Sequence, residues 1–341
     1  MPEAKKVRWG VIGATARIAN DAVIPAIRSS ETTEIVAVAS RNRDSAREIA
    51  AQAGPDVQAY GDYDSLIADP NVDVIYIPLP NNLHLGWTVE ALNHGKHVLC
   101  EKPLALNATQ AEEMRETAEG NGVILTEAFM YRYHPLQTEV AGLVRGGSLG
   151  EVSLVRASFS FVQTSEGDYR RDPGMGGGAL FDVGCYCVHI ARRVFGREPT
   201  AVTAKSLYDS QTGVDTTTTA LMEFDSGGVA LIDCSFALSL RASYEIVGSQ
   251  GSISVPRFLL GGQAAGDTME AGAYCFSQAG QDEERHSQPG NMYVSEIEAM
   301  SRRVLGEDVF LLPAEDGVGN MRALDAIAAS ARTGQKVIVT T

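Results

Sequence analysis

The sequence predicts an α/β protein in two parts: a doubly wound parallel sheet over residues 1–126, followed by a β-rich segment over residues 127–341. Up to residue 126, short apolar runs alternate with helical patterns through short connections, which is typical of a parallel sheet with helices on both faces. Beyond that point, longer runs alternate apolar and polar residues and suit a sheet with one solvent-facing side. A length of 341 residues also favours two domains.

Composition excludes several classes of partner. The formal net charge is −15, which repels nucleic acid and anionic membrane surfaces, so we expect neither as a partner. An apolar signal segment is absent ahead of the first strand, and the longest apolar runs are too short to span a membrane. The five cysteines are few and scattered, which favours reduced thiols and a cytoplasmic location.

The first expected strand, Val7–Ile12, runs into a glycine turn that leads to a helix. Such a strand–turn–helix unit holds dinucleotides, because small residues let the backbone approach the pyrophosphate at the helix N-terminus. Only one glycine stands clearly in the usual pattern, and threonine or alanine replaces the second. Pro25 predicts a kink or restart in the helix. The loop residues expected to bind cofactor are Gly13, Ala14, Thr15, Ala16, Arg17 and Ile18.

The second expected strand, Glu34–Ala39, ends in Ser40-Arg41-Asn42-Arg43 with no acid at its tip. A carboxylate there would accept hydrogen bonds from the ribose of NAD, whereas the Ser40 hydroxyl and the Arg41 and Arg43 guanidiniums suit a 2′-phosphate. This tip therefore favours NADP over NAD. The alternative is that Asn42 only caps the next helix and that the arginines are solvated.

The remaining elements of the first part follow in order. Proline and glycine mark most of their ends. The expected helices span 43–53, 64–68, about 84–94 and 108–121, and the expected strands span 72–77, 97–100 and 123–126.

The strand over residues 97–100 ends on Glu101-Lys102-Pro103. Ligands of open α/β sheets bind beyond the carboxyl ends of the strands, so Lys102 would face the ligand crevice. A lysine there can bind an anion, form a Schiff base or transfer protons. The alternative is an ordinary surface turn.

In the second part, a crossing segment over residues 127–135 leads into a helix that ends near residue 145. Residues 260–290 are rich in small and polar residues and predict a long loop. A helix and a strand are expected at 314–332 and 337–340. The other expected strands span 152–162, 201–207, 216–224, 229–236, 244–247 and 252–255.

A glycine run at 176–178 opens a helix that ends near Gly196. Asp182 and Tyr186 are four residues apart and therefore share one face of this helix. They are candidates for catalysis, although helix capping and core packing would also explain them. Cys185-x-Cys187-x-His189 does not predict a metal site, because Cys187 points away from the other two and no fourth ligand is evident.

Four motifs occur in a telling order: Gly10-Val11-Ile12-Gly13, Pro80-Asn81-Asn82-Leu83-His84, Glu101-Lys102-Pro103, and the glycine–Asp helix from 176 to 186. In this arrangement the chain resembles the Gfo/Idh/MocA oxidoreductase family over nearly its whole length. Tyr186, where many members carry histidine, and the Ser-Arg tip resemble the branch of glucose–fructose oxidoreductase, dimeric dihydrodiol dehydrogenase and NADP-dependent sugar dehydrogenases and ketoreductases.

The resemblance implies an N-terminal Rossmann domain and a C-terminal α/β domain with an open, mostly antiparallel sheet. It implies Lys102 and Tyr186 at the reacting oxygen, with Asp182 orienting the substrate or its partners. It also implies a cis Lys102–Pro103 bond and a homo-oligomer, dimer or tetramer, formed through the open sheet. Residues expected near nicotinamide and substrate are Pro80, Asn82, His84, Glu101, Lys102 and Arg170.

Hydride transfer to or from a carbinol carbon needs a group that gives or takes the hydroxyl proton. A free phenol titrates near pH 10, and a nearby lysine ammonium would lower its pKa; the lysine could also donate directly. We therefore expect an NADP-dependent oxidoreductase acting on a secondary hydroxyl or ketone of a sugar or polyol. The alternatives are a non-catalytic NADP-binding regulator of the same fold and a trans-dihydrodiol dehydrogenase.

Overall fold

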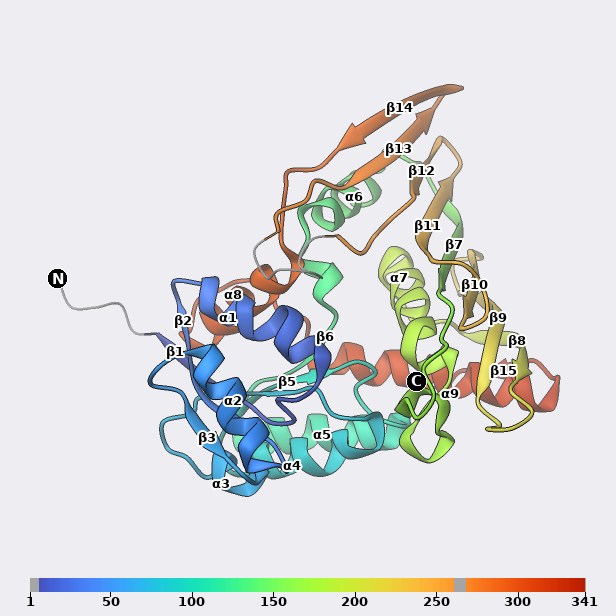
Figure 1. The fold of residues 1–341 in the computed structure, drawn as a ribbon. Coiled ribbons are helices and arrows are strands. Elements are labelled where there is room, and N and C mark those ends of the chain that lie inside the picture. The colour runs from blue at the N-terminus through green and yellow to red at the C-terminus, as the bar shows by residue number, and fades with distance from the viewer. Residues whose placement is uncertain (1–5, 261–267, 341) are drawn as a thin grey trace.

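The computed structural model describes residues 6–260 and 268–340 and contains two sheets that lie side by side (Figure 1). The first sheet has six parallel strands in the order β3-β2-β1-β4-β5-β6, which is the order of a Rossmann domain. This confirms the predicted doubly wound sheet. The strands are β1 (Val7–Val11), β2 (Thr33–Ala39), β3 (Gln58–Tyr60), β4 (Val74–Ile77), β5 (His97–Glu101) and β6 (Leu125–Ala128).

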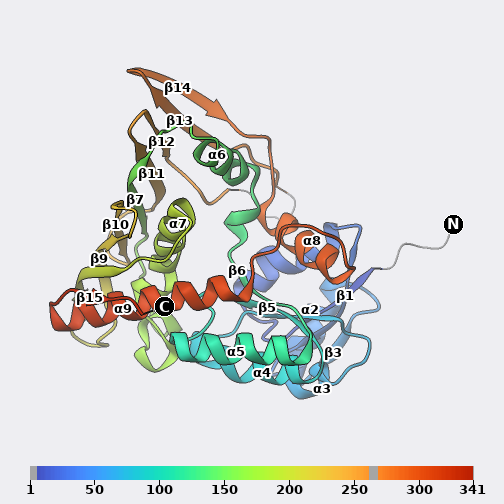
Figure 2. The same cartoon turned by 180° about the vertical axis from the view of Figure 1, so that it is seen from behind.

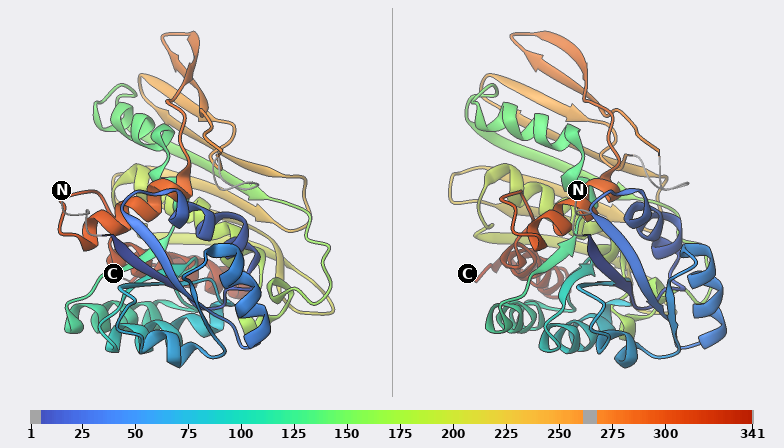
Figure 3. Two further views of the ribbon diagram at one scale, coloured as in Figure 1. Left: turned by 60° about the vertical axis from the view of Figure 1, so that its left-hand side comes forward. Right: turned by 90° about the vertical axis from the view of Figure 1, so that its left-hand side faces the viewer.

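Helices cover both faces of this sheet, with α1 on one side and α4 and α5 on the other (Figures 1 and 3). Asn42, Asp62 and Asn107 cap α2, α3 and α5 through their side-chain oxygens. A π-helical turn, η1 (Ala19–Val23), precedes α1, and Pro25 lies in the first turn of α1, which confirms the expected restart. The helices are α1 (Ile24–Ser29), α2 (Arg43–Ala53), α3 (Tyr63–Ile67), α4 (His84–Asn93) and α5 (Ala108–Asn121).

The second sheet has nine strands in the order β14-β13-β12-β11-β7-β10-β9-β8-β15. All of its pairings are antiparallel except the β7–β10 pair, as expected for an open, mostly antiparallel sheet. The strands are β7 (Val152–Ser160), β8 (Ala201–Tyr208), β9 (Asp215–Glu223), β10 (Val229–Ser235), β11 (Arg241–Gly248), β12 (Gly251–Val255), β13 (Ala273–Gln278), β14 (Gln281–His286) and β15 (Val337–Ile338).

Helices α6 (Pro135–Arg145), α7 (Cys185–Phe195) and α9 (Ala314–Thr333) lie on one side of this sheet, and Figure 2 shows α7 and α9 against it from behind. On β10, Ala230 and Ile232 are buried, whereas Leu231 between them is 44% exposed. The predicted alternation of a half-covered sheet is therefore confirmed, and the other side of the sheet carries no helix within the described residues.

The expected loop over 260–290 is wrong for its second half, where β13 and β14 form a hairpin; residues 261–267 of that expectation lie outside the described residues. Helix α8 (Met292–Val304) was not expected either. It returns to the first sheet and packs against α1, and the Trp9 indole donates to the Ser301 hydroxyl at 3.0 Å. No helix in the described ranges is both long and apolar enough to cross a bilayer.

Candidate active site

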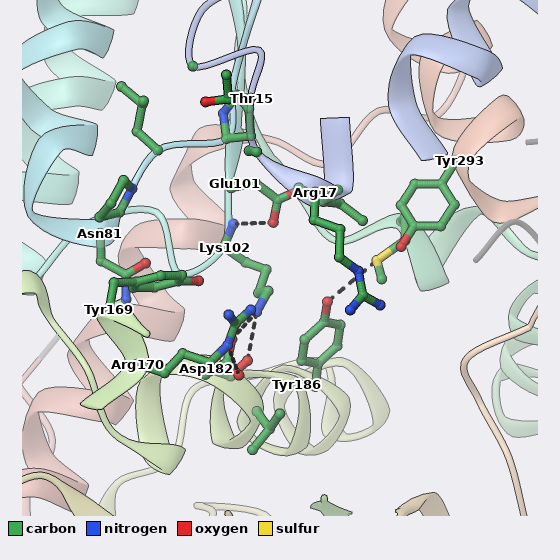
Figure 4. A pocket seen from close by; sticks show the side chains of 18 of the residues that line it. Thr15, Arg17, Asn81, Glu101, Lys102, Tyr169, Arg170, Asp182, Tyr186 and Tyr293 are labelled. Carbon is green, nitrogen blue, oxygen red and sulfur yellow. Dashed lines mark hydrogen bonds and ion pairs between the residues drawn. The ribbon is translucent and has the colours of Figure 1, made fainter. Parts of the chain in front are cut away.

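A cavity of about 660 Å³ lies between the two sheets, beyond the carboxyl ends of β1, β2, β4 and β5 and against the start of α7. In an open parallel sheet this edge is where ligands bind. Figure 4 shows Lys102 reaching into the cavity from the strand side, whereas Asp182 and Tyr186 rise from the helical segment opposite. The structure thus brings together the three residues that the sequence singled out for catalysis.

Lys102 follows the last residue of β5, and its bond to Pro103 is cis, as expected. Its ammonium donates to the Asp182 carboxylate at 2.9 Å and to the Asp182 backbone oxygen at 2.7 Å. The other oxygen of that carboxylate accepts from Arg170 Nε at 2.8 Å. Asp182 therefore joins the strand-end lysine to an arginine of the second part of the chain.

Lys102, Asp182 and Arg170 are all charged at neutral pH. Burial by itself raises the pKa of Asp182, but Lys102 and Arg170 outweigh it and lower that pKa. Burial likewise opposes the charge on Lys102, yet Asp182 raises its pKa well above the usual lysine range. The carboxylate and both cations are ionised, so the lysine acts as a fixed positive charge.

Tyr186 lies in the first turn of α7, after a π-helical turn, η6 (Leu180–Gly184), and is 3% exposed. Its ring centre is 5.3 Å from Lys102 Nζ, and its hydroxyl donates to Met130 Sδ at 3.5 Å. In the structure, burial and the Glu101 carboxylate raise the pKa of Tyr186 well above 10. Tyr186 is thus a protonated phenol. The lowering of this pKa by Lys102 stays a prediction.

Glu101 also lines the cavity. One of its oxygens accepts from the Tyr76 hydroxyl at 2.7 Å, and the other accepts from the Lys102 backbone N–H at 3.3 Å. Burial raises its pKa. Glu101 therefore places a second carboxylate close to the lysine and the phenol.

The glycine turn after β1 is built for a close approach. Gly13 has φ +63°, and a Cβ there would lie 2.5 Å from Leu79 Cδ2, so a side chain is excluded on both grounds. Thr15, Ala16, Arg17 and Ile18 line the cavity, and helical structure follows at η1. The first N–H groups of a helix have no partner within it. The turn therefore fits the pyrophosphate of a dinucleotide despite its atypical glycines.

The tip of β2 forms the far end of the cavity, lined by Ser40, Arg41 and Asn42. Asn42 caps α2 by accepting from the N–H groups of Asp44 and Ser45 at 2.9 and 3.1 Å, which is the alternative role considered for it. Arg41 is exposed, and Tyr63 beside it lines the cavity as well. This end offers one guanidinium to an anion.

Four of the expected binding residues lie outside the cavity lining. Ala14 is buried beneath the turn, where its N–H donates to the Ala39 oxygen at 3.0 Å. The Arg43 side chain runs over Gly61, and Asn82 faces solvent. His84 is completely buried, and its ring nitrogens lie 3.0 and 2.8 Å from the Pro103 and Leu79 carbonyl oxygens. His84 thus braces the two strand ends rather than facing a ligand.

Several lining residues were missed by the sequence reasoning. Asn81, and not its neighbour Asn82, points into the cavity and donates to the Gly176 oxygen at 2.8 Å. The pair of asparagines carried no signal that distinguished them. The aromatic wall comes from segments that are remote in sequence, which local patterns could not connect. Its members are Tyr63, Phe159, Phe161, Tyr169 and Tyr293.

The cysteine–histidine segment of α7 is packed into the core. Cys187 Sγ lies 3.7 Å from the Asp233 carbonyl oxygen, and His189 binds Tyr131 and Asp316 at 2.7 and 2.8 Å. Within the described residues, no group of three or more ligand-type side chains could hold a metal ion.

The strand order, the glycine turn and the cavity between two domains define an NAD(P)-binding oxidoreductase built on a Rossmann domain. The chain belongs to the Gfo/Idh/MocA family. Residues 7–129 match the model of its NAD-binding Rossmann domain, and residues 138–254 match a model of its C-terminal domain.

Named relatives include a D-xylose 1-dehydrogenase (NADP(+)) from Haloferax volcanii, 38% identical over 331 residues that cover 96% of this chain and 98% of the relative. An aldose-aldose oxidoreductase from Caulobacter crescentus, complexed with glycerol, superposes with a TM-score of 0.88 at 26% identity and covers 98% of this chain and 100% of its own. A 3-ketoreductase from Actinomadura kijaniata, complexed with NADP and TDP-benzene, gives 0.87 at 29%, covering 96% and 98%.

Proposed function

We propose that this oxidoreductase transfers hydride between NADP and a secondary alcohol or ketone of a sugar or polyol, with Lys102 and Tyr186 handling the proton. The observation that carries the proposal is the meeting of these two side chains in one cavity, although they come from different domains. The nicotinamide supplies or accepts the hydride. The named relatives act on sugars, which supports this class of substrate.

Tyr186 is suited to donate a proton to a carbonyl oxygen. Among the described residues its hydroxyl has one acceptor, the Met130 thioether sulfur at 3.5 Å, which is a weak acceptor that a substrate oxygen would displace. Lys102 uses two of its three ammonium hydrogens on Asp182, so one remains for the same oxygen. A fixed cation beside that oxygen stabilises the negative charge that develops as hydride arrives at the carbon.

Tyr169 and Arg170 extend this polar wall. The Arg170 guanidinium lies 4.7 Å from the Tyr169 ring centre, and its Nε holds Asp182. Asn81 lies in the same cavity. These donors suit the several hydroxyl groups of a sugar.

The test is turnover of two variants. Lys102→Ala and Tyr186→Phe should each lower kcat by about 10²-fold or more, the contribution typical of proton transfer by a positioned group. Both should keep the wild-type circular dichroism spectrum and NADPH affinity, because Asp182 retains its bond to Arg170. Reduced-nicotinamide absorbance with a panel of aldoses, ketoses, polyols and a benzene dihydrodiol measures the rate.

Lys6→Ala serves as a control, because Lys6 is exposed and lies outside the cavity. An active Lys102→Ala variant would remove the lysine from the mechanism. Turnover confined to a benzene dihydrodiol would replace the sugar assignment by the dihydrodiol alternative. Tight NADPH binding without turnover of any compound in the panel would favour the regulatory alternative.

A further inference from the structure

A second cavity, of about 680 Å³, lies between α6 and α7 and reaches Tyr244 and Ile246 on β11. It shares no lining residue with the first cavity. Figure 2 shows both helices on the same side of the second sheet. Part of its lining is apolar and includes Val140, Val144 and Ile190.

The lining is also basic, in a protein whose formal net charge is −15. Five arginines line the cavity, against the two carboxylates of Glu198 and Asp316. Arg192 binds both Glu198 oxygens at 2.6 Å and lies 3.5 Å from Asp316, which also pairs with His189. Arg197 pairs with Asp225 at 2.5 Å. Both lining carboxylates are therefore already occupied.

Within the described residues, three arginines of the lining form no ion pair: Arg132, Arg145 and Arg193. In the ranges 6–260 and 268–340, no carboxylate lies within 4 Å of any of them. Arg193 donates to the side-chain oxygen of Gln137 at 2.6 Å and to its backbone oxygen, which are both neutral partners. Burial, together with repulsion from Arg132 and Arg145, lowers the pKa of Arg193 to about 10. Asp316 attracts Arg132 from a longer distance, but the three like charges lie close together and form no ion pair within the described residues.

Unused hydrogen-bond donors lie at the same place. Arg132 Nε and Gln137 Nε2 are both buried and have no acceptor among the described residues. Gln137 is completely buried, and its side-chain oxygen also accepts from the Tyr244 hydroxyl at 3.0 Å. Buried donors are nearly always paired in folded proteins, so a surplus of donors together with uncompensated cations indicates a missing acceptor with negative charge.

We propose that the second cavity binds a small organic anion whose phosphate or carboxylate groups are held by Arg132, Arg145 and Arg193 and whose carbon skeleton packs on the apolar side chains of the lining. Guanidinium groups bind both kinds of oxyanion through paired N–H donors. The volume of the cavity is in the range of small-molecule sites. This site is separate from the proposed cofactor site and does not depend on the proposed reaction.

The experiment is calorimetric titration of the protein, saturated with NADP⁺, with pyrophosphate and in parallel with citrate. Saturable binding of one probe is expected, and the better probe distinguishes a phosphate from a carboxylate ligand. Arg145→Gln and Arg193→Gln should each weaken it by about tenfold or more, the effect of losing one charge-assisted hydrogen bond. The Arg145 side chain forms no hydrogen bond or ion pair within the described residues, so its replacement should leave the fold intact, and Arg145→Lys should recover part of the affinity.

Arg302→Gln is the matched control, because Arg302 is half-exposed on α8 and pairs with Glu307 far from this cavity. It should leave the affinity unchanged, as should Arg41→Ala in the first cavity. The proposal is overturned if neither probe binds saturably, or if Arg145→Gln binds as well as the wild type. It is equally overturned if Arg41→Ala abolishes binding, because the anion would then occupy the cofactor site.

Discussion

Asp182 sets the electrostatics of the candidate active site more than any other residue. Its carboxylate binds Lys102 and Arg170 together, which keeps the lysine cationic, and it also contributes to raising the pKa of the neighbouring Tyr186. Types and spacings of side chains predicted that Lys102, Asp182 and Tyr186 matter. They could not predict that one carboxylate binds both cations, because that depends on distances of a few ångströms between residues from two parts of the chain.

Sequence patterns also could not distinguish the roles of Arg41 and Arg43 at the tip of β2. Both were predicted to bind the 2′-phosphate, and only Arg41 lines the cavity, because the first turn of α2 carries Arg43 over Gly61. We expect Arg41→Ala to weaken NADPH binding about tenfold or more, since a charge-assisted bond to phosphate is lost. NADH binding, which involves no such phosphate, should hardly change. Fluorescence titration with both nucleotides measures the two dissociation constants.

Arg43→Ala is the internal control for this prediction and should affect neither nucleotide. Equal losses of NADPH and NADH affinity in Arg41→Ala would contradict the 2′-phosphate assignment. A strong NADPH defect in Arg43→Ala would instead restore the broader prediction from the sequence.

At the scale of elements, buried strands were easier to predict than edge strands. The β4 and β5 runs are buried and apolar, as expected of central parallel strands. By contrast, β14 reads Gln-Asp-Glu-Glu-Arg-His and is polar on both faces, because it is the edge of the second sheet and only pairs through its backbone with β13. Such charged edges prevent further pairing, but they give no alternation to recognise.

Strand β6 contains a buried carboxyl group, that of Glu127, which forms a hydrogen bond to a neighbouring segment. Glu127 accepts from the Leu104 N–H at 2.8 Å through one oxygen, whereas its other oxygen has no hydrogen-bond donor among the described residues. Burial and the nearby Asp316 raise the pKa of Glu127 to about 8. Native Glu127 therefore keeps a proton that the unfolded chain releases near pH 4.5. Its contribution to stability is complete below that pH and is lost as the pH rises through 8.

We expect Glu127→Gln to remove this part of the pH dependence, because the amide keeps an acceptor for Leu104 and does not ionise. Between pH 5 and 8 the wild type should lose about 2–4 kcal/mol more of its unfolding free energy than the variant. Denaturant titrations at both pH values measure the difference, with the exposed Glu48→Gln as control. Parallel pH dependence of wild type and Glu127→Gln would show that this carboxyl is ionised in the native state.

At the scale of the whole molecule, the strands of the two sheets follow one another along the chain, but the helices do not divide in the same way. Strand β6 ends the first sheet at residue 128, two residues beyond the predicted limit, and β7 begins the second. Helix α8, from the C-terminal part, then returns to cover the first sheet. Sequence order alone could not place it, because an amphipathic helix does not specify which sheet it covers. This return joins the two walls of the active-site cavity.

The uncovered side of the second sheet is where we expect a second copy of the chain to bind. Across it run Leu221, Leu231, Arg156 and Glu245 in register on β9, β10, β7 and β11, an apolar pair beside a pair of opposite charges 2.6 Å apart. Because both charges and apolar groups lie on one surface, that surface can complement itself across a twofold axis. The wild type should therefore have at least twice the subunit mass by light scattering.

Leu231→Glu should convert the protein to a monomer, because it places a charge within the apolar part of this surface. The monomer should still fold, since Arg156 stands directly opposite residue 231 on β7 and can pair with the new carboxylate. Leu238→Glu is a matched control: Leu238 is also 44% exposed but lies in the loop after β10. A wild type that scatters as a monomer, or a Leu231→Glu variant that stays assembled, would show that the open sheet is not the contact between subunits.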